Sequence, residues 1–330
     1  MKRLRQNLAF VTTRKLLAAR AVANYSLVTL GRPVLRLLDL EVTYRCPCLC
    51  EQCYANQPMP DDDPELSVAE IGDLVEQARK LGALQVLLSG GEPLVRRDLR
   101  EILQACQPHR MLVTMCTSGV GLTHERVVDL ADAGLAVLVF SVDSLDPAVH
   151  DRNRGVAGLH ARVLAAAIAA REVGMRVIFN TVATREKLAG EEIYRLADLA
   201  TRHGATLNLT IPTPQGRWHE DDRVALRPAD RVRLRTALQH ANIRTDVDSA
   251  YGRRRCPAAV EKISVDPFGN VRACPLLPAA WGNVRAELLR TLWASMRAHP
   301  GLAKRTTFCP AADPAFRKTY SDLFSEGVMS

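Results

Sequence analysis

The chain has 330 residues, of which 47% are hydrophobic and 24% charged, and its formal net charge is +8. This composition fits one large globular core, or a core with a small second domain, and excludes a low-complexity or fibrous protein. The positive charge does not predict a nucleic-acid partner, because the arginines are dispersed, aromatic residues make up only 5%, and no known nucleic-acid motif is present.

The nine cysteines are odd in number and accompany no secretory signal. The chain starts Met-Lys-Arg-Leu-Arg, and the apolar runs that follow are broken by charge before they reach membrane length. We therefore expect a cytoplasmic protein with metal-bound thiolates rather than disulfides.

Residues 1–35 form a basic segment in which Lys and Arg alternate with Leu, Ala and Val at roughly helical spacing. Such a helix could lie on a membrane surface. We favour a helix that packs on the outside of the domain that follows.

Three cysteines, Cys46, Cys50 and Cys53, follow the first apolar strand, expected at residues 38–43. Three thiolates can hold a [4Fe-4S] cluster and leave one iron open, whereas four would close it. A structural zinc site is the alternative, but zinc ribbons usually show two paired C-x-x-C knuckles and four ligands. The spacing C-x-x-x-C-x-x-C resembles the signature of the radical S-adenosylmethionine (SAM) enzymes. Cys48 is interleaved with the three, and we expect it to point elsewhere.

The resemblance implies that the open iron binds the amino and carboxylate groups of SAM. A second matching motif follows one helix and one strand later, after a capping box at Ser67 and Glu70. Its two glycines let the backbone approach a ligand closely, and it resembles the Gly-Gly-Glu-Pro motif that grips the SAM amino group in that family. The residues are Gly90, Gly91, Glu92 and Pro93.

Strands and helices alternate as far as residue 211. Six strand–helix units imply a parallel sheet curled into a partial or full barrel, an α/β fold of the (β/α)6 TIM-like type. Functional loops in such a sheet lie at the carboxyl ends of the strands. The expected strands are 38–43, 85–89, 111–117, 136–141, 176–183 and 206–211, and the expected helices are 67–82, 98–106, 123–133, 159–173 and 191–203.

The fourth strand ends in Ser141 and Asp143, and the run His-Asp-Arg-Asn-Arg-Gly follows with Arg154 as its second arginine. This region resembles the S-x-D-G and H-D-x-x-R-G stretch of the same family. The resemblance implies that polar groups at the strand end hold the SAM ribose and that Arg154 meets the SAM carboxylate through charge-assisted hydrogen bonds. Ser144 stands where the family has Gly, so the turn can differ.

The tail contains Cys256, Cys274 and Cys309, the second of them on an expected hairpin. It resembles the SPASM or twitch extension of radical SAM enzymes, which implies an auxiliary [4Fe-4S] cluster. No further run of close cysteines follows, so at most one such cluster is supported. Ala312 stands where a twitch pair would have Cys; the fourth position is left open, to Asp313, to substrate or to another Cys.

Two cysteines remain outside these motifs. Cys106 shares a helical face with apolar residues and is expected in the core. Cys116 is expected to pack within a strand, although a thiol facing the barrel lumen could donate hydrogen to a substrate radical.

Three divisions of the chain follow: a basic helical segment at 1–35, a radical SAM core at 36–225 and a twitch- or SPASM-like extension at 226–330. The resemblance implies cleavage of SAM to a 5′-deoxyadenosyl radical, with a flavodoxin- or ferredoxin-type electron donor. We expect a small natural product of the sugar or aminocyclitol type to be oxidised or epimerised. A maturase acting on a ribosomally made peptide is the alternative, an enzyme of a haem-like pathway is a third reading, and a zinc-binding structural or nucleic-acid-binding protein is the non-enzyme reading.

Overall fold

The computed structural model describes residues 15–55, 64–218, 221–245, 255–303 and 306–325. Its centre is one sheet of ten strands. The strands are β1 (Leu37–Thr43), β2 (Gln85–Gly90), β3 (Leu112–Thr117), β4 (Val137–Ser141), β5 (Arg176–Val182), β6 (Thr206–Thr210), β7 (Ile243–Thr245), β8 (Lys262–Val265), β9 (Asn270–Cys274) and β10 (Leu277–Asn283).

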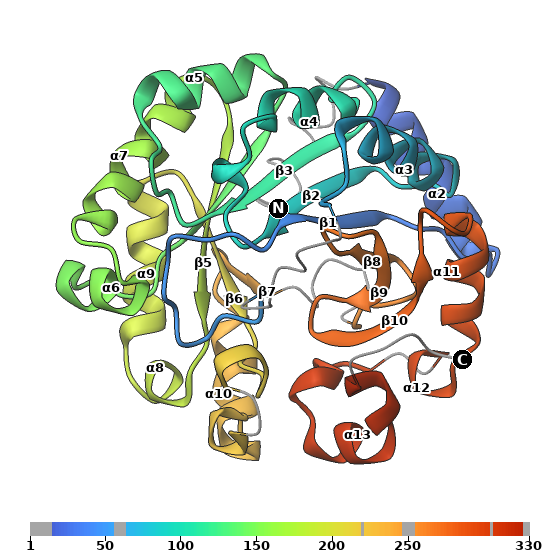
Figure 1. The fold of residues 1–330 in the computed structure, drawn as a ribbon. Helices are drawn as coiled ribbons and strands as arrows, with labels where there is room; N and C mark the ends of the chain where they lie inside the picture. The colour runs from blue at the N-terminus through green and yellow to red at the C-terminus, as the bar shows by residue number, and fades with distance from the viewer. Residues whose placement is uncertain (1–14, 56–63, 219–220, 246–254, 304–305, 326–330) are drawn as a thin grey trace.

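The strand order is β10-β9-β8-β1-β2-β3-β4-β5-β6-β7. Strands β1 to β7 pair in parallel, β8 runs parallel to β1, and β9 and β10 add antiparallel hairpins. Helices cover the outer side of the curved sheet (Figure 1). The expected α/β partial barrel with a C-terminal extension is therefore confirmed.

The described residues form twelve α-helices, which include the five that the sequence predicts in the core, each within two residues of its expected bounds. They are α2 (Lys15–Thr29), α3 (Val68–Lys80), α4 (Leu99–Ala105), α5 (His124–Asp132), α6 (Pro147–Arg154), α7 (Leu159–Glu172), α8 (Arg185–Ala189), α9 (Glu192–Arg202), α10 (Pro228–Ala237), α11 (Leu289–Ala298), α12 (Pro300–Ala303) and α13 (Pro314–Thr319), with short 3₁₀ turns including η1 (Pro93–Val95), η2 (Gly216–Trp218) and η5 (Pro310–Ala312).

Strand β1 shows how the sequence divides the two faces of the sheet. Its whole length is buried, as expected for a parallel strand covered on both sides. Leu38 and Leu40 share one apolar core with Ile71 of α3. The alternate residues Asp39 and Glu41 are buried on the inner face, where cationic side chains neutralise them.

The starts of α3 and α6 both carry capping signals in the sequence, but only α3 was predicted. The capping box at Ser67 and Glu70 is present at the start of α3, as predicted. Helix α6 was not anticipated as a helix, although Asp146 caps it, Pro147 occupies its first turn and Gly155 ends it in the left-handed conformation. Those three signals were present but were overlooked beside the motif.

Helix α2 packs against the barrel, as expected for the part of residues 1–35 that the structure describes. Arg20 donates hydrogen bonds to the carbonyl oxygens of Ala83 (2.6 Å) and Arg110 (2.8 Å), which precede β2 and β3. Asn24 donates to the carbonyl of Gly82 at 2.7 Å. Residues 1–14 lie outside the described residues. No helix in the described part of the chain is long and apolar enough to cross a membrane.

The tail continues the same sheet instead of forming a separate layer. Two buried ion pairs fasten it to β1: Arg272 lies 2.7 Å from Glu41, and Lys262 lies 2.8 Å from Asp39. The sheet also runs through the expected boundary at residue 225, because β7 pairs with β6. The division into a core at 36–225 and an extension at 226–330 thus stays a prediction from the sequence.

Candidate active site

The loop after β1 presents Cys46, Cys50 and Cys53, and each sulfur accepts a hydrogen bond. The backbone N–H of Cys48 donates to Cys46 Sγ at 3.4 Å, and Arg154 Nη1 donates to Cys50 Sγ at 3.3 Å. A backbone hydrogen bond at Ala55 lowers the pKa of Cys53 against the larger effect of burial, which raises it. Donors aimed at sulfur favour the thiolate form that binds iron. For Cys50, the hydrogen bond with the Cys48 thiol and burial outweigh Arg154 and raise the pKa above its ordinary value. The three residues therefore fit a [4Fe-4S] cluster.

We expected Cys48 to point away from the other three cysteines, and this prediction is wrong. Its thiol lies within hydrogen-bonding reach of both Cys46 and Cys50, because it stands two residues from each on a tightly curved loop. Among the described residues, no three His, Cys, Asp or Glu side chains converge on one point as the ligands of a single ion do. A four-iron cluster is much larger than an ion, and its thiolates stand around it.

Gly90 and Gly91 lie directly beside the start of the cysteine loop. Gly91 donates to the carbonyl of Thr43 at 2.7 Å, and a Cβ on Gly91 would lie only 2.6 Å from the carbonyl oxygen of Tyr44. Gly90 has φ +115, which disfavours any side chain there. The close approach of these two strand ends therefore requires both glycines.

The Glu92 side chain joins the turn after β2 to the end of β3 through hydrogen bonds. Its carboxylate is fully buried and accepts hydrogen bonds from Thr117 Oγ1 (2.8 Å), Ser118 N (2.7 Å) and Leu94 N (3.1 Å). Burial raises the pKa of Glu92, while these donors lower it. Thr117 and Ser118 at the end of β3 therefore have a structural role as donors to Glu92. Pro93 starts the turn η1.

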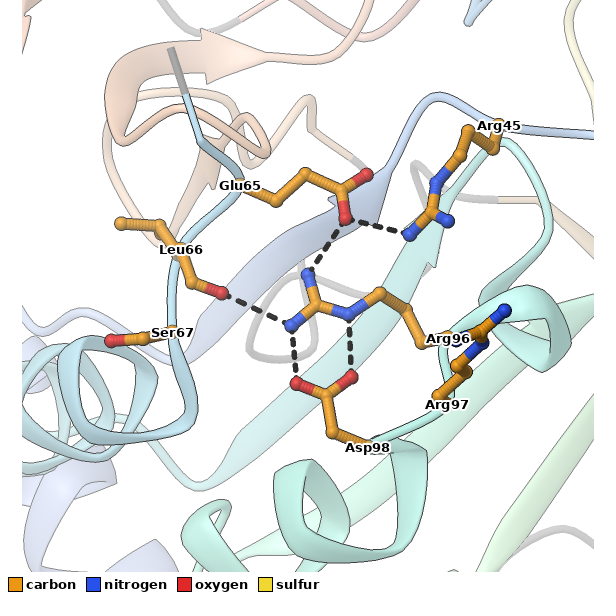
Figure 2. A pocket seen from close by; sticks show the side chains of 7 residues that line it. All are labelled: Arg45, Glu65, Leu66, Ser67, Arg96, Arg97 and Asp98. Carbon is orange, nitrogen blue, oxygen red and sulfur yellow. Dashed lines mark hydrogen bonds and ion pairs between the residues drawn. The ribbon is translucent and has the colours of Figure 1, made fainter.

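Shortly after this turn, Arg96 lies at the centre of a network of charged residues that we call the clamp (Figure 2). Arg96 uses all five of its N–H donors: two bind Asp98 at 2.7 Å, one binds Glu65 at 3.2 Å, and two bind the carbonyls of Val42 (2.9 Å) and Leu66 (3.1 Å). Arg96 is 6% exposed. A hollow of about 420 Å³ lies beside it, and Arg96 itself has no donor left for a ligand there.

At the end of β4, Asp143 and Arg154 form a bidentate pair. Arg154 Nε and Nη2 lie 2.6 and 2.8 Å from the two carboxylate oxygens. Burial raises the pKa of Asp143, but the guanidinium outweighs this and holds it below its ordinary value. The Asp143 backbone N–H donates to His150 Nδ1 at 3.1 Å, and Gln52 Nε2 donates to the carboxylate at 3.3 Å.

Ser141 lies at the carboxyl end of the same strand and is half-buried. Asn180, on the neighbouring β5, accepts hydrogen bonds from Asn208 (2.8 Å) and Thr210 (3.0 Å) of β6. The side-chain oxygen of Asn180 thus bonds within the sheet itself. Cys106 is fully buried in the core, as predicted, and burial raises its pKa to about 12.

The inner face near the cysteine loop carries a phenol and a thiol. Burial raises the pKa of Tyr54 well above its ordinary value, and the nearby charges of Glu41, Asp39 and Cys116 raise it further. The phenol therefore stays protonated. Cys116 is half-buried on β3 and follows Met115, which lies in the core, so strand alternation places it on the opposite, lumen side. Its role stays a prediction.

A loop that follows β6 passes over the cysteine loop; we call residues 211–218 the crossing loop. Arg217 donates from its backbone to the Cys53 carbonyl (3.3 Å) and from Nη1 to the Leu49 carbonyl (2.9 Å). Gln215 donates to the carbonyl of Leu276 in the tail. Sequence reasoning missed this loop, since its only signal was a polar stretch with Pro and Gly.

The tail brings Cys256, Cys274 and Cys309 together. Burial raises the pKa of Cys309, and the charges of the other two thiols raise it further. Backbone hydrogen bonds from Ala311 and Ala312 favour its thiolate. The three thiols therefore fit a second iron–sulfur cluster.

Asp313, which we had considered as a fourth ligand, caps α13. Its carboxylate accepts from Ala315 N at 3.1 Å and lies 3.8 Å from Arg231. Ala312, at the position where a fourth Cys was expected, is fully buried. The fourth position of this set stays open to other ligands.

The chain is similar to known proteins over most of its length. A model of the Radical SAM superfamily matches residues 40–200. The PqqA peptide cyclase of Rhizobium meliloti (strain 1021) is 31% identical over 273 residues, which cover 77% of this chain and 72% of that protein. The PqqA peptide cyclase of Streptomyces rochei is 32% identical over 250 residues, covering 72% of this chain and 68% of that protein.

Solved structures share the fold. Streptococcus suis SuiB bound to its precursor peptide SuiA superposes with a TM-score of 0.65 at 19% identity, covering 88% of this chain and 68% of that one. At this identity the likeness concerns the fold alone.

Proposed function

The chain belongs to the radical SAM superfamily, and we propose that within it this enzyme removes a hydrogen atom from a peptide and thereby modifies that peptide. It is a radical SAM enzyme that uses a [4Fe-4S] cluster and SAM. The single observation that carries the peptide proposal is the similarity to PqqA peptide cyclases, which spans 77% of this chain and so extends well beyond residues 40–200.

This proposal reverses the order of the substrates expected from the sequence. A sugar or aminocyclitol stood first there and a ribosomally made peptide second. The peptide now stands first because two relatives, each more than 30% identical and aligned over more than two thirds of this chain, are named for a peptide substrate.

We assign Cys46, Cys50 and Cys53 as the ligands of the SAM-binding cluster. When bound and reduced, the cluster and SAM supply the 5′-deoxyadenosyl radical that takes hydrogen from an unactivated C–H bond. The residues of this chain bind and orient. Gly90 and Gly91 bring the end of β2 close to the start of the cysteine loop, and Glu92 and Pro93 fix the turn that follows. Ser141 offers a hydroxyl at the end of β4.

Cys256, Cys274 and Cys309 are assigned to an auxiliary cluster, which supplies an electron acceptor after hydrogen abstraction. The ion pair between Arg272 and Glu41 holds this part of the tail on β1, the strand that leads into the first cysteine loop. A flavodoxin- or ferredoxin-type electron donor remains a prediction.

Deuterium transfer tests the substrate class. The reconstituted enzyme, SAM and dithionite are incubated with peptides from cells grown in deuterated medium, and in parallel with deuterated sugars and aminocyclitols. Deuterium in 5′-deoxyadenosine from the peptide pool alone supports the proposal. Transfer from sugars or aminocyclitols and not from peptides would refute it, and a Cys50→Ala variant gives the background.

A further inference from the structure

Arg154 contacts both the cysteine loop and Asp143 at the end of β4. Its guanidinium Nη1 lies 3.3 Å from Cys50 Sγ, whereas Nε and Nη2 are held by Asp143. We propose that Arg154 is a positioning residue that raises the reduction potential of the SAM-binding cluster through its contact with Cys50. This inference rests on the proposed assignment of Cys50 as a cluster ligand.

The guanidinium is held in one orientation. The side chain of Arg154 is 12% exposed and that of Asp143 is 3% exposed, so water competes little for either. Asp143 is itself fixed by His150, which accepts from its backbone, and by Gln52, which donates to its carboxylate. Because both oxygens of Asp143 are engaged by Arg154, the third nitrogen is directed to the sulfur.

The backbone of the same residue anchors the cysteine loop. Leu49 donates to the Arg154 carbonyl at 2.9 Å, one residue before Cys50. A Cβ on Gly155 would lie 3.1 Å from Leu49 Cβ, so the end of α6 and the loop are in close contact. The distance between the guanidinium and Cys50 is therefore set by the fold, not by a mobile side chain.

The sign of the effect follows from charge. Reduction adds one electron to the cluster and its thiolates, and a buried cation that donates to a thiolate stabilises that extra negative charge. Asp143 opposes this effect in part. Two of the five N–H donors of Arg154 remain for a ligand, so this role adds to the SAM-carboxylate role that the motif implies, and the two roles can be separated.

The test is a redox titration of the reconstituted full chain without SAM, with dithionite as reductant and electron paramagnetic resonance as readout. Arg154→Gln is expected to shift the potential to more negative values, and Asp143→Asn to less negative values. Arg152→Gln is the matched control, because Arg152 is an exposed arginine on the same helix. Iron content and melting temperature are measured for every variant.

Opposite shifts in the two variants, with Arg152→Gln unchanged, support the proposal, since a merely structural loss would not reverse sign. An Arg154→Gln variant that weakens SAM binding but leaves the potential unchanged overturns it. If that variant takes up no cluster, Asp143→Asn decides: an unchanged or more negative potential overturns the proposal. Wild-type protein without any cluster would instead refute the proposed function.

Discussion

Replacing Gly216 with alanine tests whether the crossing loop positions the cysteine loop. Gly216 has φ +57, a left-handed conformation in which an L side chain costs about 1–2 kcal/mol. An alanine Cβ would overlap the carbonyl oxygen of Cys53 and lie 2.7 Å from the Cα of Tyr54. Overpacking of this kind costs roughly 1–3 kcal/mol more, because backbone must move. The expected loss of unfolding free energy is about 2–5 kcal/mol.

Gly174→Ala is the matched control. Gly174 has φ +80, and no atom lies within 4 Å of an added Cβ. It should therefore lose only the conformational part, about 1–2 kcal/mol. Urea unfolding of both variants measures the difference, and formation of 5′-deoxyadenosine measures the effect on the cysteine loop. If Gly216→Ala matches Gly174→Ala in stability and cleaves SAM at the wild-type rate, the reasoning about the crossing loop is wrong.

Three further changes test other parts of the structure. Arg96→Lys should cost about 2–4 kcal/mol of unfolding free energy, because Lys cannot replace five fixed donors; Arg97→Lys, at an exposed neighbour, should cost almost nothing, and equal losses would refute the clamp. The pKa of Glu70 is lowered to about 2, first by the hydrogen bond from Arg285. The Glu70 carboxylate therefore stabilises the fold above pH ~4.5, and this stability is lost as pH falls toward 2. The urea midpoint of the wild type should fall over this pH range by more than that of a Glu70→Gln variant, and equal falls in the two proteins would contradict the prediction. Cys274→Ala should lose the tail iron and keep SAM cleavage without finished product; normal turnover would make the tail cysteines structural.

The core of the fold was predictable because its elements carry local signals. Strands β1 to β6 and helices α3, α4, α5, α7 and α9 lie within a residue or two of their expected positions, since apolar runs and caps mark them. The short helices α6 and α8 were not predicted. Strand β7 is only three residues long, so it has no detectable alternation. Strand β10 contains Pro278 and Gly282, which argue against a strand, and its pairing with β9 depends on tertiary structure.

The candidate site divides in the same way. Its cysteines, glycines and Arg154 were found because they stand in recognisable spacings. The prediction that Cys48 points away from the other thiols was wrong, because the spacing of cysteines does not encode the curvature of the loop that carries them. The contact between Gly216 and Cys53 joins residues far apart in the chain, and nothing local marks either partner. Long-range contacts of this kind require the structure.

The most direct test of the account is an iron and sulfide count on protein reconstituted without oxygen, with Mössbauer spectra of the wild type and a Cys46/Cys50/Cys53 triple alanine variant. The account predicts about eight irons per chain, falling to about four in the variant. Zinc without sulfide, or iron that is unchanged in the variant, would contradict the assignment of these three cysteines to the SAM-binding cluster.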